Sequence, residues 1–265
     1  LIPEPDGTLW VLSAEGIFRL KRPRGPLEPE FQAHLLPGEI IRELRRDRKG
    51  RIWMAGNRGV LMLAGARLPR FTPAQGLRWS VVVFLAVGHD DTVWIGYDAG
   101  HGVSRLRLTG SVREIEHFGA DTVLRSGDIS FVRVDRRGWV WVGTDNGVDV
   151  FGGRGWRHFG TRDGMVWYDT LLNSFLEDAD GTIWIGTARG LARHTGDASS
   201  LVAPPPKAIL SHLRFGGRDS APAQILRIPY KERLLRIRYT GLSFARPHEL
   251  RFRYRLQGPG SQWVE

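Results

Sequence analysis

A tryptophan flanked by apolar residues recurs five times in the first three quarters of this 265-residue chain, and its spacing limits the possible fold more than any other feature. The intervals between successive copies are 43, 41, 47 and 43 residues. Self-similarity at such a period is typical of architectures in which each repeat forms one supersecondary unit. The five copies are Trp10, Trp53, Trp94, Trp141 and Trp184.

Each copy also carries turn residues at fixed distances from its tryptophan. Asp47 and Gly50 begin and end a four-residue segment before Trp53, which predicts a type I turn because Asp caps it and Gly accepts a positive φ. The apolar triplets predict short buried strands, and Asn146-Gly147 predicts a hairpin behind one of them. We therefore predict an all-β chain with four antiparallel strands per repeat, the unit of a β-propeller blade, and with the tryptophans in the core between blades.

Two repeats depart from this pattern. Only Leu1 to Pro5 precede the first tryptophan motif, which predicts a first blade without its leading strand. Since an open arc of five blades would expose a sheet edge, we expect further blades in the parent protein. In the third repeat Gly88 and Asp91 replace the turn Asp and Gly, and the glycine after the tryptophan moves to Gly102, which predicts an enlarged hairpin.

The last quarter of the chain differs in charge and in pattern. Residues 204–265 hold 12 basic and 4 acidic residues, a net charge of +8, against 26 and 24, or +2, for residues 1–203. Three consecutive prolines from position 204 predict a stiff linker. Strict alternation within 235–239 and 251–256 places arginines on one sheet face and apolar side chains on the other. We predict blades over 1–203, then the linker and the start of a truncated immunoglobulin-like β-sandwich, through which the protein forms a homodimer.

The repeated pattern, fullest at 135–148 and 178–191, resembles the two-component regulator propeller repeat. The segment 239–244, followed by 252–258 and Trp263, resembles the beginning of the triple-tyrosine (Y_Y_Y) domain that follows such propellers. The resemblance implies the periplasmic, ligand-sensing region of a bacterial inner-membrane protein, typically a two-component or hybrid histidine kinase. It also implies a small polar ligand, often a carbohydrate fragment. The output machinery of such a kinase does not occur in these residues.

Several irregular residues share one face of the predicted propeller. Chain direction alternates in a four-stranded meander, so the hairpins between second and third strands lie on the same face as the loops that enter the blades. Aromatic rings beside polar groups suit the binding of a small polar ligand. The alternative is that these side chains cover blade edges. The candidate ligand-binding residues are Arg78, Trp79, Tyr97, Asp98, His101, Trp167, Tyr168 and Asp169.

Other functions have weaker support in the sequence. The chain has no cysteine, and its eight histidines have no metal-ligand spacing, so we expect no metal, no cofactor and no catalytic residue in this segment. A propeller enzyme of the lyase or glycosidase kind, with Asp98, His101 and Asp169 as acid–base groups, and a protein-interaction scaffold remain the alternatives. The arginine row from position 236 to 255 favours a solvated face or dimer contact over nucleic acid. No apolar run is long enough to cross a membrane, so we expect membrane attachment only through other parts of the parent.

Overall fold

The computed structural model describes residues 1–4, 6–13, 16–21, 25–29, 35–65, 67–110, 112–153, 155–195, 207–215, 217–220, 235–241, 252–255, 262 and 264. The chain divides into two compact units, Leu1–Leu201 and Val202–Glu265. Each unit is described by itself.

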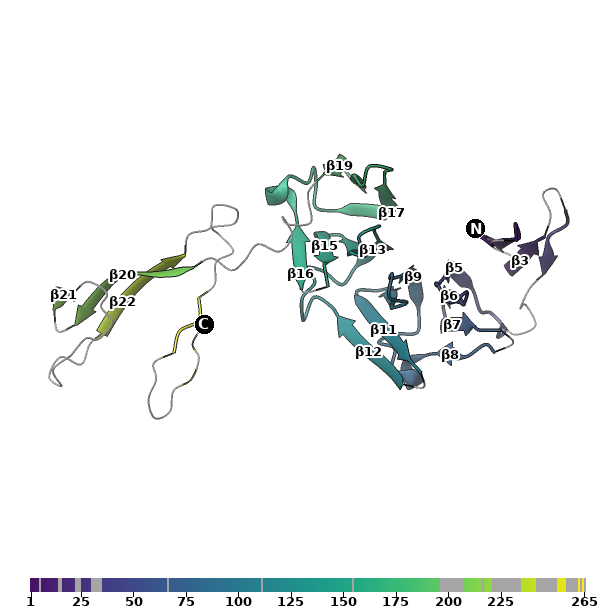
Figure 1. Cartoon of the computed structure of the whole chain (residues 1–265), viewed down its shortest axis with the longest axis horizontal. Helices are drawn as coiled ribbons and strands as arrows, with labels where there is room; N and C mark the ends of the chain where they lie inside the picture. The colour runs from purple at the N-terminus through teal and green to yellow at the C-terminus, as the bar shows by residue number, and fades with distance from the viewer. Residues whose placement is uncertain are drawn as a thin grey trace. The chain divides into compact units, whose positions relative to one another are not determined.

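The first unit is a series of antiparallel sheets whose strands follow one another in chain order (Figure 1). Four sheets have four strands, and the fifth has three within the described residues. The first strands are β1 (Ile2–Pro3), β5 (Ile41–Arg46), β9 (Val82–Val87), β13 (Ile129–Val134) and β17 (Thr170–Glu177). The second strands, which carry the repeat tryptophans, are β2 (Leu9–Ser13), β6 (Ile52–Gly56), β10 (Val93–Tyr97), β14 (Val140–Thr144) and β18 (Ile183–Thr187).

The outer half of each sheet completes the meander. The third strands are β3 (Gly16–Leu20), β7 (Gly59–Leu63), β11 (Val103–Thr109), β15 (Gly147–Phe151) and β19 (Gly190–His194). The fourth strands are β4 (Glu28–Pro29), β8 (Arg70–Phe71), β12 (Val112–Phe118) and β16 (Trp156–Phe159). Single 3-10 turns, η2 (Pro73–Gln75) and η3 (Thr161–Asp163), precede the third and fifth blades.

The first strands of consecutive sheets lie against one another, β1 on β5, β5 on β9, β9 on β13 and β13 on β17. They line the inner side of the arc in Figure 1, and the fourth strands lie on its outer side. Sheets that converge at their first strands in this way are the blades of a β-propeller. The predicted fold class is therefore confirmed for this unit.

The repeat tryptophans pack between blades, as predicted. Trp53 is fully buried in a cluster with Val93 and Leu106 of the next blade, and Trp141 packs with Ile183 of the blade after it. The fifth copy, Trp184, is only half-buried. On its sheet, leucines 171, 172, 176 and 191 are exposed.

A second role of the tryptophan was not predicted. In four repeats its indole N–H donates a hydrogen bond to a carboxylate six residues earlier, at the start of the turn between the first and second strands. We call these acceptors the turn carboxylates. The donor–acceptor distances are 2.9 Å for Trp10 to Glu4, 2.8 Å for Trp53 to Asp47, 3.0 Å for Trp141 to Asp135 and 2.6 Å for Trp184 to Asp178.

Three expectations about single blades need correction or qualification. The first blade does have a leading strand, because β1 pairs with β2 through Ile2 and Trp10. A leading strand of two residues is long enough to pair with β2 because the turn between them is tight, with the Glu4 N–H donating to the Thr8 carbonyl at 2.7 Å. The third turn keeps its shape because Asp91 adopts the positive φ, 61°, that glycine adopts elsewhere. A fourth strand of the fifth blade would fall on 196–203, outside the described residues.

The second unit contains one described sheet, with β20 (Ala208–Phe215) between β21 (Arg218–Ser220) and β22 (Leu235–Gly241). The predicted strand at 235–239 is thus present. Its apolar side chains are not buried as expected, since Ile237 and Tyr239 are each 37% exposed. In the second predicted strand only a bridge from Tyr254 to Val264 is described. Prolines 204–206, Arg251 and Trp263 lie outside the described residues.

Candidate functional site

Two kinds of loop meet on one face of the propeller, which we call the loop face: the hairpins between second and third strands, and the loops that enter the blades. In three blades the glycine at the end of the hairpin between second and third strands donates its backbone N–H to the loop that enters the next blade. These bonds join Gly59 to Ser80 (2.7 Å), Gly102 to Gly127 (3.0 Å) and Gly147 to Tyr168 (2.5 Å). A Cβ at Gly59 would lie 2.1 Å from the carbonyl oxygen of Phe71 at the end of β8, so the close packing of this hairpin on β8 requires glycine. The hairpins therefore hold the entry loops in place.

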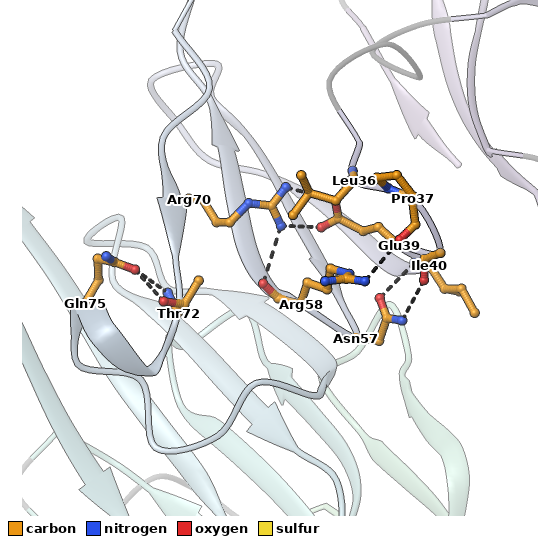
Figure 2. A network of polar contacts seen from close by, with 10 residues as sticks. Leu36, Pro37, Glu39, Ile40, Asn57, Arg58, Arg70, Thr72 and Gln75 are labelled. Carbon is orange, nitrogen blue, oxygen red and sulfur yellow. Dashed lines mark hydrogen bonds and ion pairs between the residues drawn. The ribbon is translucent and has the colours of Figure 1, made fainter.

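Figure 2 shows how the loop into the second blade is anchored. Glu39 forms an ion pair with Arg70 of β8, with Nη2 to Oε2 at 2.8 Å. Although burial opposes it, the bonds from Arg70 and from the Leu36 N–H hold the pKa of Glu39 below its usual value. Asn57 of the hairpin accepts the Ile40 N–H at 2.8 Å. The loop is thus fixed by charge and by backbone contacts before any ligand arrives.

The first aromatic pair belongs to the third blade. Trp79 of its entry loop stacks on His101 of its hairpin, with ring centroids 4.2 Å apart and planes 10° from parallel. Trp79 remains 41% exposed. Beside it, Arg78 lies 3.2 Å from the carboxylate of Asp121. Asp98 is also exposed, and its carbonyl accepts the N–H of His101. The structure therefore brings four of the candidate residues together around an exposed ring.

Tyr97 is not a loop residue, contrary to the prediction. It ends β10, is 1% exposed, and its hydroxyl donates to Ser104 Oγ at 2.8 Å while accepting the Arg78 N–H at 3.2 Å. Burial raises the pKa of Tyr97. This series of hydrogen bonds continues to His117, whose Nδ1 lies 2.6 Å from Ser104 Oγ. Burial, with Arg78, lowers the pKa of His117. Tyr97 is therefore buried under the entry loop and holds it through the hydrogen bond from the Arg78 N–H.

The second aromatic pair belongs to the fifth blade. Trp167 and Tyr168 have ring centroids 4.5 Å apart. The guanidinium carbon of Arg189, in the hairpin of the same blade, lies 3.6 Å from the centre of the Trp167 ring. Asp169 connects the entry loop to the hairpin through its backbone, because its carbonyl accepts the Ala188 N–H at 3.0 Å. Arg189 was missed in the sequence, although it occupies the same place in its hairpin as Arg58 does in the second blade.

These two aromatic pairs remain separate sites on the same face. Within the described residues, no ring contact, hydrogen bond or ion pair joins the Trp79 pair to the Trp167 pair. Asp121, which follows the third blade, was also missed, since nothing in the repeat marks it. A ligand small enough for one pair would therefore meet one aromatic stack and one arginine.

A charged cluster lies on the inner strands. Glu43 of β5 pairs with Arg45 and lies 3.5 Å from Arg133 of β13, and it accepts the Leu85 N–H of the blade between them. Arg133 also donates to Asn173 of β17 at 2.8 Å. Burial raises the pKa of Glu43 despite the two guanidinium groups. The cluster joins four blades through polar bonds. Two guanidinium groups share the one carboxylate of Glu43, and these contacts run from blade to blade, so we assign the cluster to blade cohesion.

Two features are absent from the described residues. Within them, no group of three or more His, Asp or Glu side chains could hold a metal ion. Nor, in this part of the chain, is any helix long and apolar enough to span a membrane.

Comparison with known proteins agrees with the architecture. Residues 169–189 match the model of the two component regulator propeller family. No curated protein matches the chain. The extracellular domain of a Bacteroides protein, described as a hybrid two component system of B. thetaiotaomicron, superposes with a TM-score of 0.63 at 16% identity, covering 86% of this chain and 32% of that one.

Two further solved structures are similar. The extracellular domain of a protein described as a one component system of B. thetaiotaomicron gives a TM-score of 0.55 at 18% identity, covering 80% of this chain and 29% of that one. Virginiamycin B lyase of Staphylococcus aureus gives 0.54 at 14% identity, covering 73% and 68%. At these identities the likeness establishes a shared fold. The chain spans about a third of the length of the two Bacteroides structures.

Proposed function

We propose that this chain is part of the extracytoplasmic sensing region of a membrane-bound signalling protein of the two-component type. The family match at 169–189 and the fold shared with extracellular domains of such systems support the proposal. A sensing region binds its ligand and has no need to convert it, and ligand sites are usually largely preformed. The loop face fits this requirement because its entry loops are fixed by hydrogen bonds while Trp79 and Tyr168 stay exposed.

The ligand is a small polar molecule, with a carbohydrate as the leading class. The observation that carries this is the stack of Trp79 on His101 beside Arg78 and Asp121. An exposed flat ring can cover the C–H face of a sugar, and neighbouring charged groups can bond its hydroxyls. Binding would then favour one arrangement of propeller and C-terminal unit, since a ligand shifts an equilibrium only by its differential affinity for two states. The homodimer expected through the C-terminal unit stays a prediction.

The experiment is a thermal-shift screen of the chain against neutral and acidic oligosaccharides. A ligand that binds only the native state raises the melting temperature. For a hit, we expect the variant His101→Ala to weaken binding by about fivefold, because roughly 1 kcal/mol of ring contact is lost. The matched control is His212→Ala, a histidine of the second unit whose side chain is 40% exposed.

The outcomes separate the functions. Equal affinity in His101→Ala and the control would contradict the proposed site. Turnover of a screened compound would favour the enzyme alternative over the sensor.

A further inference from the structure

The third blade lacks the turn carboxylate that the other four blades have. At that position stands Gly88, six residues before Trp94. The turn itself does not need it, because the Asp90 carboxylate accepts the Thr92 N–H at 3.1 Å. Asp180 does the same for Thr182 in the fifth blade, at 2.9 Å, and there a turn carboxylate is present as well. Gly88 therefore removes one acceptor and leaves the turn intact.

The consequence falls on the Trp94 indole. Trp94 is 2% exposed, and its indole N–H has no acceptor among the described residues, whereas the other four repeat tryptophans each have one. The nitrogen is not sealed inside the protein, because Trp94 lines a cavity that opens to solvent. An acceptor can thus reach it from outside.

This cavity, which we call the third-turn cavity, has a volume of about 240 Å³. It lies at the turns between first and second strands, at the opposite end of the blades from the loop face. Trp94, Val140 and Phe151 give it an apolar floor. Pockets for drug-sized ligands begin at about 300 Å³, so the occupant is smaller than these.

Two arginines from β11 line the third-turn cavity. Arg105 is already paired with Glu116 and covers the ring of Trp94. Arg107 is held more loosely, 4.0 Å from the Asp90 carboxylate and 3.4 Å from the Thr92 hydroxyl, with its side chain 45% exposed. Arg107 can therefore turn toward an incoming anion, because it gives up only weak contacts to do so.

We propose that the third-turn cavity binds a small carboxylic acid whose carboxylate replaces the missing turn carboxylate and accepts hydrogen bonds from the Trp94 indole and from Arg107. The other blades show the chemistry, since Asp47 and Asp135 each accept a bond from the repeat tryptophan and from an arginine. In the third blade the ligand supplies the carboxylate. The body of the acid rests on Phe151 and Val140. This site is separate from the loop face and is independent of the ligand proposed there.

The probes are acetate, L-lactate and D-glucuronate, with D-glucose as the neutral partner of glucuronate. The readout is the indole N–H signal of Trp94 in proton–nitrogen correlation spectra, assigned by its loss in Trp94→Phe. We expect the signal to move on titration with at least one acid and to stay in place with glucose. An unmoved signal with all three acids overturns the proposal.

The decisive variant is Gly88→Asp, which restores the repeat. Gly88 does not have a positive φ, and the atom nearest to an added Cβ is Asp90 Oδ1, at 2.7 Å, which also accepts the Thr92 N–H and must shift within its turn. The fifth blade accommodates both carboxylates, since Asp178 and Asp180 occupy the corresponding positions there. We expect the melting temperature to rise or stay level, because the indole N–H gains its acceptor, and the response to the acid to fall by about tenfold or more. The charge control is Asn146→Asp, on an exposed hairpin of the loop face.

A response of equal size in Gly88→Asp and in the unchanged chain would place the acid elsewhere and overturn the proposal. If Gly88→Asp does not fold, the second variant is Arg107→Gln, which changes an exposed side chain. It should weaken the acid response by several-fold with the melting temperature unchanged, and an unchanged response would likewise overturn the proposal.

Discussion

Removing one turn carboxylate tests whether the repeat tryptophan depends on it. In Asp135→Ala the indole N–H of Trp141, which is 1% exposed, loses its acceptor. The backbone N–H groups of Arg137 and Trp139, each 2.9 Å from Asp135 Oδ1, lose theirs too. The buried indole alone accounts for about 1–3 kcal/mol, and the turn bonds add about 1 kcal/mol because water can replace part of them. We expect a loss of about 2–4 kcal/mol in the free energy of unfolding.

The same change in the fifth blade supplies an internal comparison. Trp184 is only half-buried, so water can replace Asp178 as the acceptor in Asp178→Ala. We expect a cost of about 1 kcal/mol or less there. The control is Asp145→Ala, an exposed hairpin carboxylate, which should change stability by less than about 0.5 kcal/mol.

The assay is urea unfolding at 25 °C, followed by tryptophan fluorescence and far-ultraviolet circular dichroism. Both probes are needed because one blade can open before the rest. If Asp135→Ala were no less stable than Asp145→Ala, the turn carboxylate would not support the tryptophan, and the reasoning for the third-turn cavity would weaken with it.

Two further changes test packing and pH dependence. Gly143→Ala should lower the free energy of unfolding by about 1–3 kcal/mol, because its Cβ would lie 2.2 Å from the buried ring of Phe131. Gly155→Ala, with open space around the added Cβ, should lower it by less than about 1 kcal/mol. Thermal unfolding of both variants distinguishes steric overlap from a general effect of replacing glycine. Burial, with two nearby arginines, lowers the pKa of His194. As the pH falls below about 6.5, the unfolded chain therefore takes up a proton before the native state does, and the free energy of unfolding declines. His194→Phe should make this decline shallower in unfolding measured from pH 7.5 to 5, and an equal slope would contradict the assignment.

The fold could be predicted because its signals are local and repeated. Asp, Gly and Trp recur at fixed spacing, and each has a backbone or packing reason that one copy alone would not reveal. The leading strand of the first blade was missed although Ile2 precedes Trp10 by eight residues, the same spacing that pairs Arg45 with Trp53 across β5 and β6. That spacing was the signal that could have found it.

The candidate site could be predicted only in part. Trp79 and His101 lie together because both loops of a blade end on one face, which topology requires. The enlarged hairpin predicted from Gly102 is present, since residues 98–102 separate β10 from β11 whereas only 145–146 separate β14 from β15, but Tyr97 was misplaced because it ends β10 instead of belonging to that hairpin. The partners of the aromatic rings, Arg189 and Asp121, depend on side-chain directions in loops, which no period in the sequence encodes.

The short range of the tryptophan–carboxylate bond also bears on how such a chain acquires its structure. Its partners are separated by only six residues, so each turn and its indole can associate before any neighbouring blade exists. Contacts of low sequence separation form early at little cost in loop-closure entropy. During synthesis each blade can thus organise its inner hairpin as soon as it has been made, and the next blade then packs on a tryptophan already held in place. In the third blade, with Gly88 in place of a carboxylate, the inner hairpin lacks this local bond.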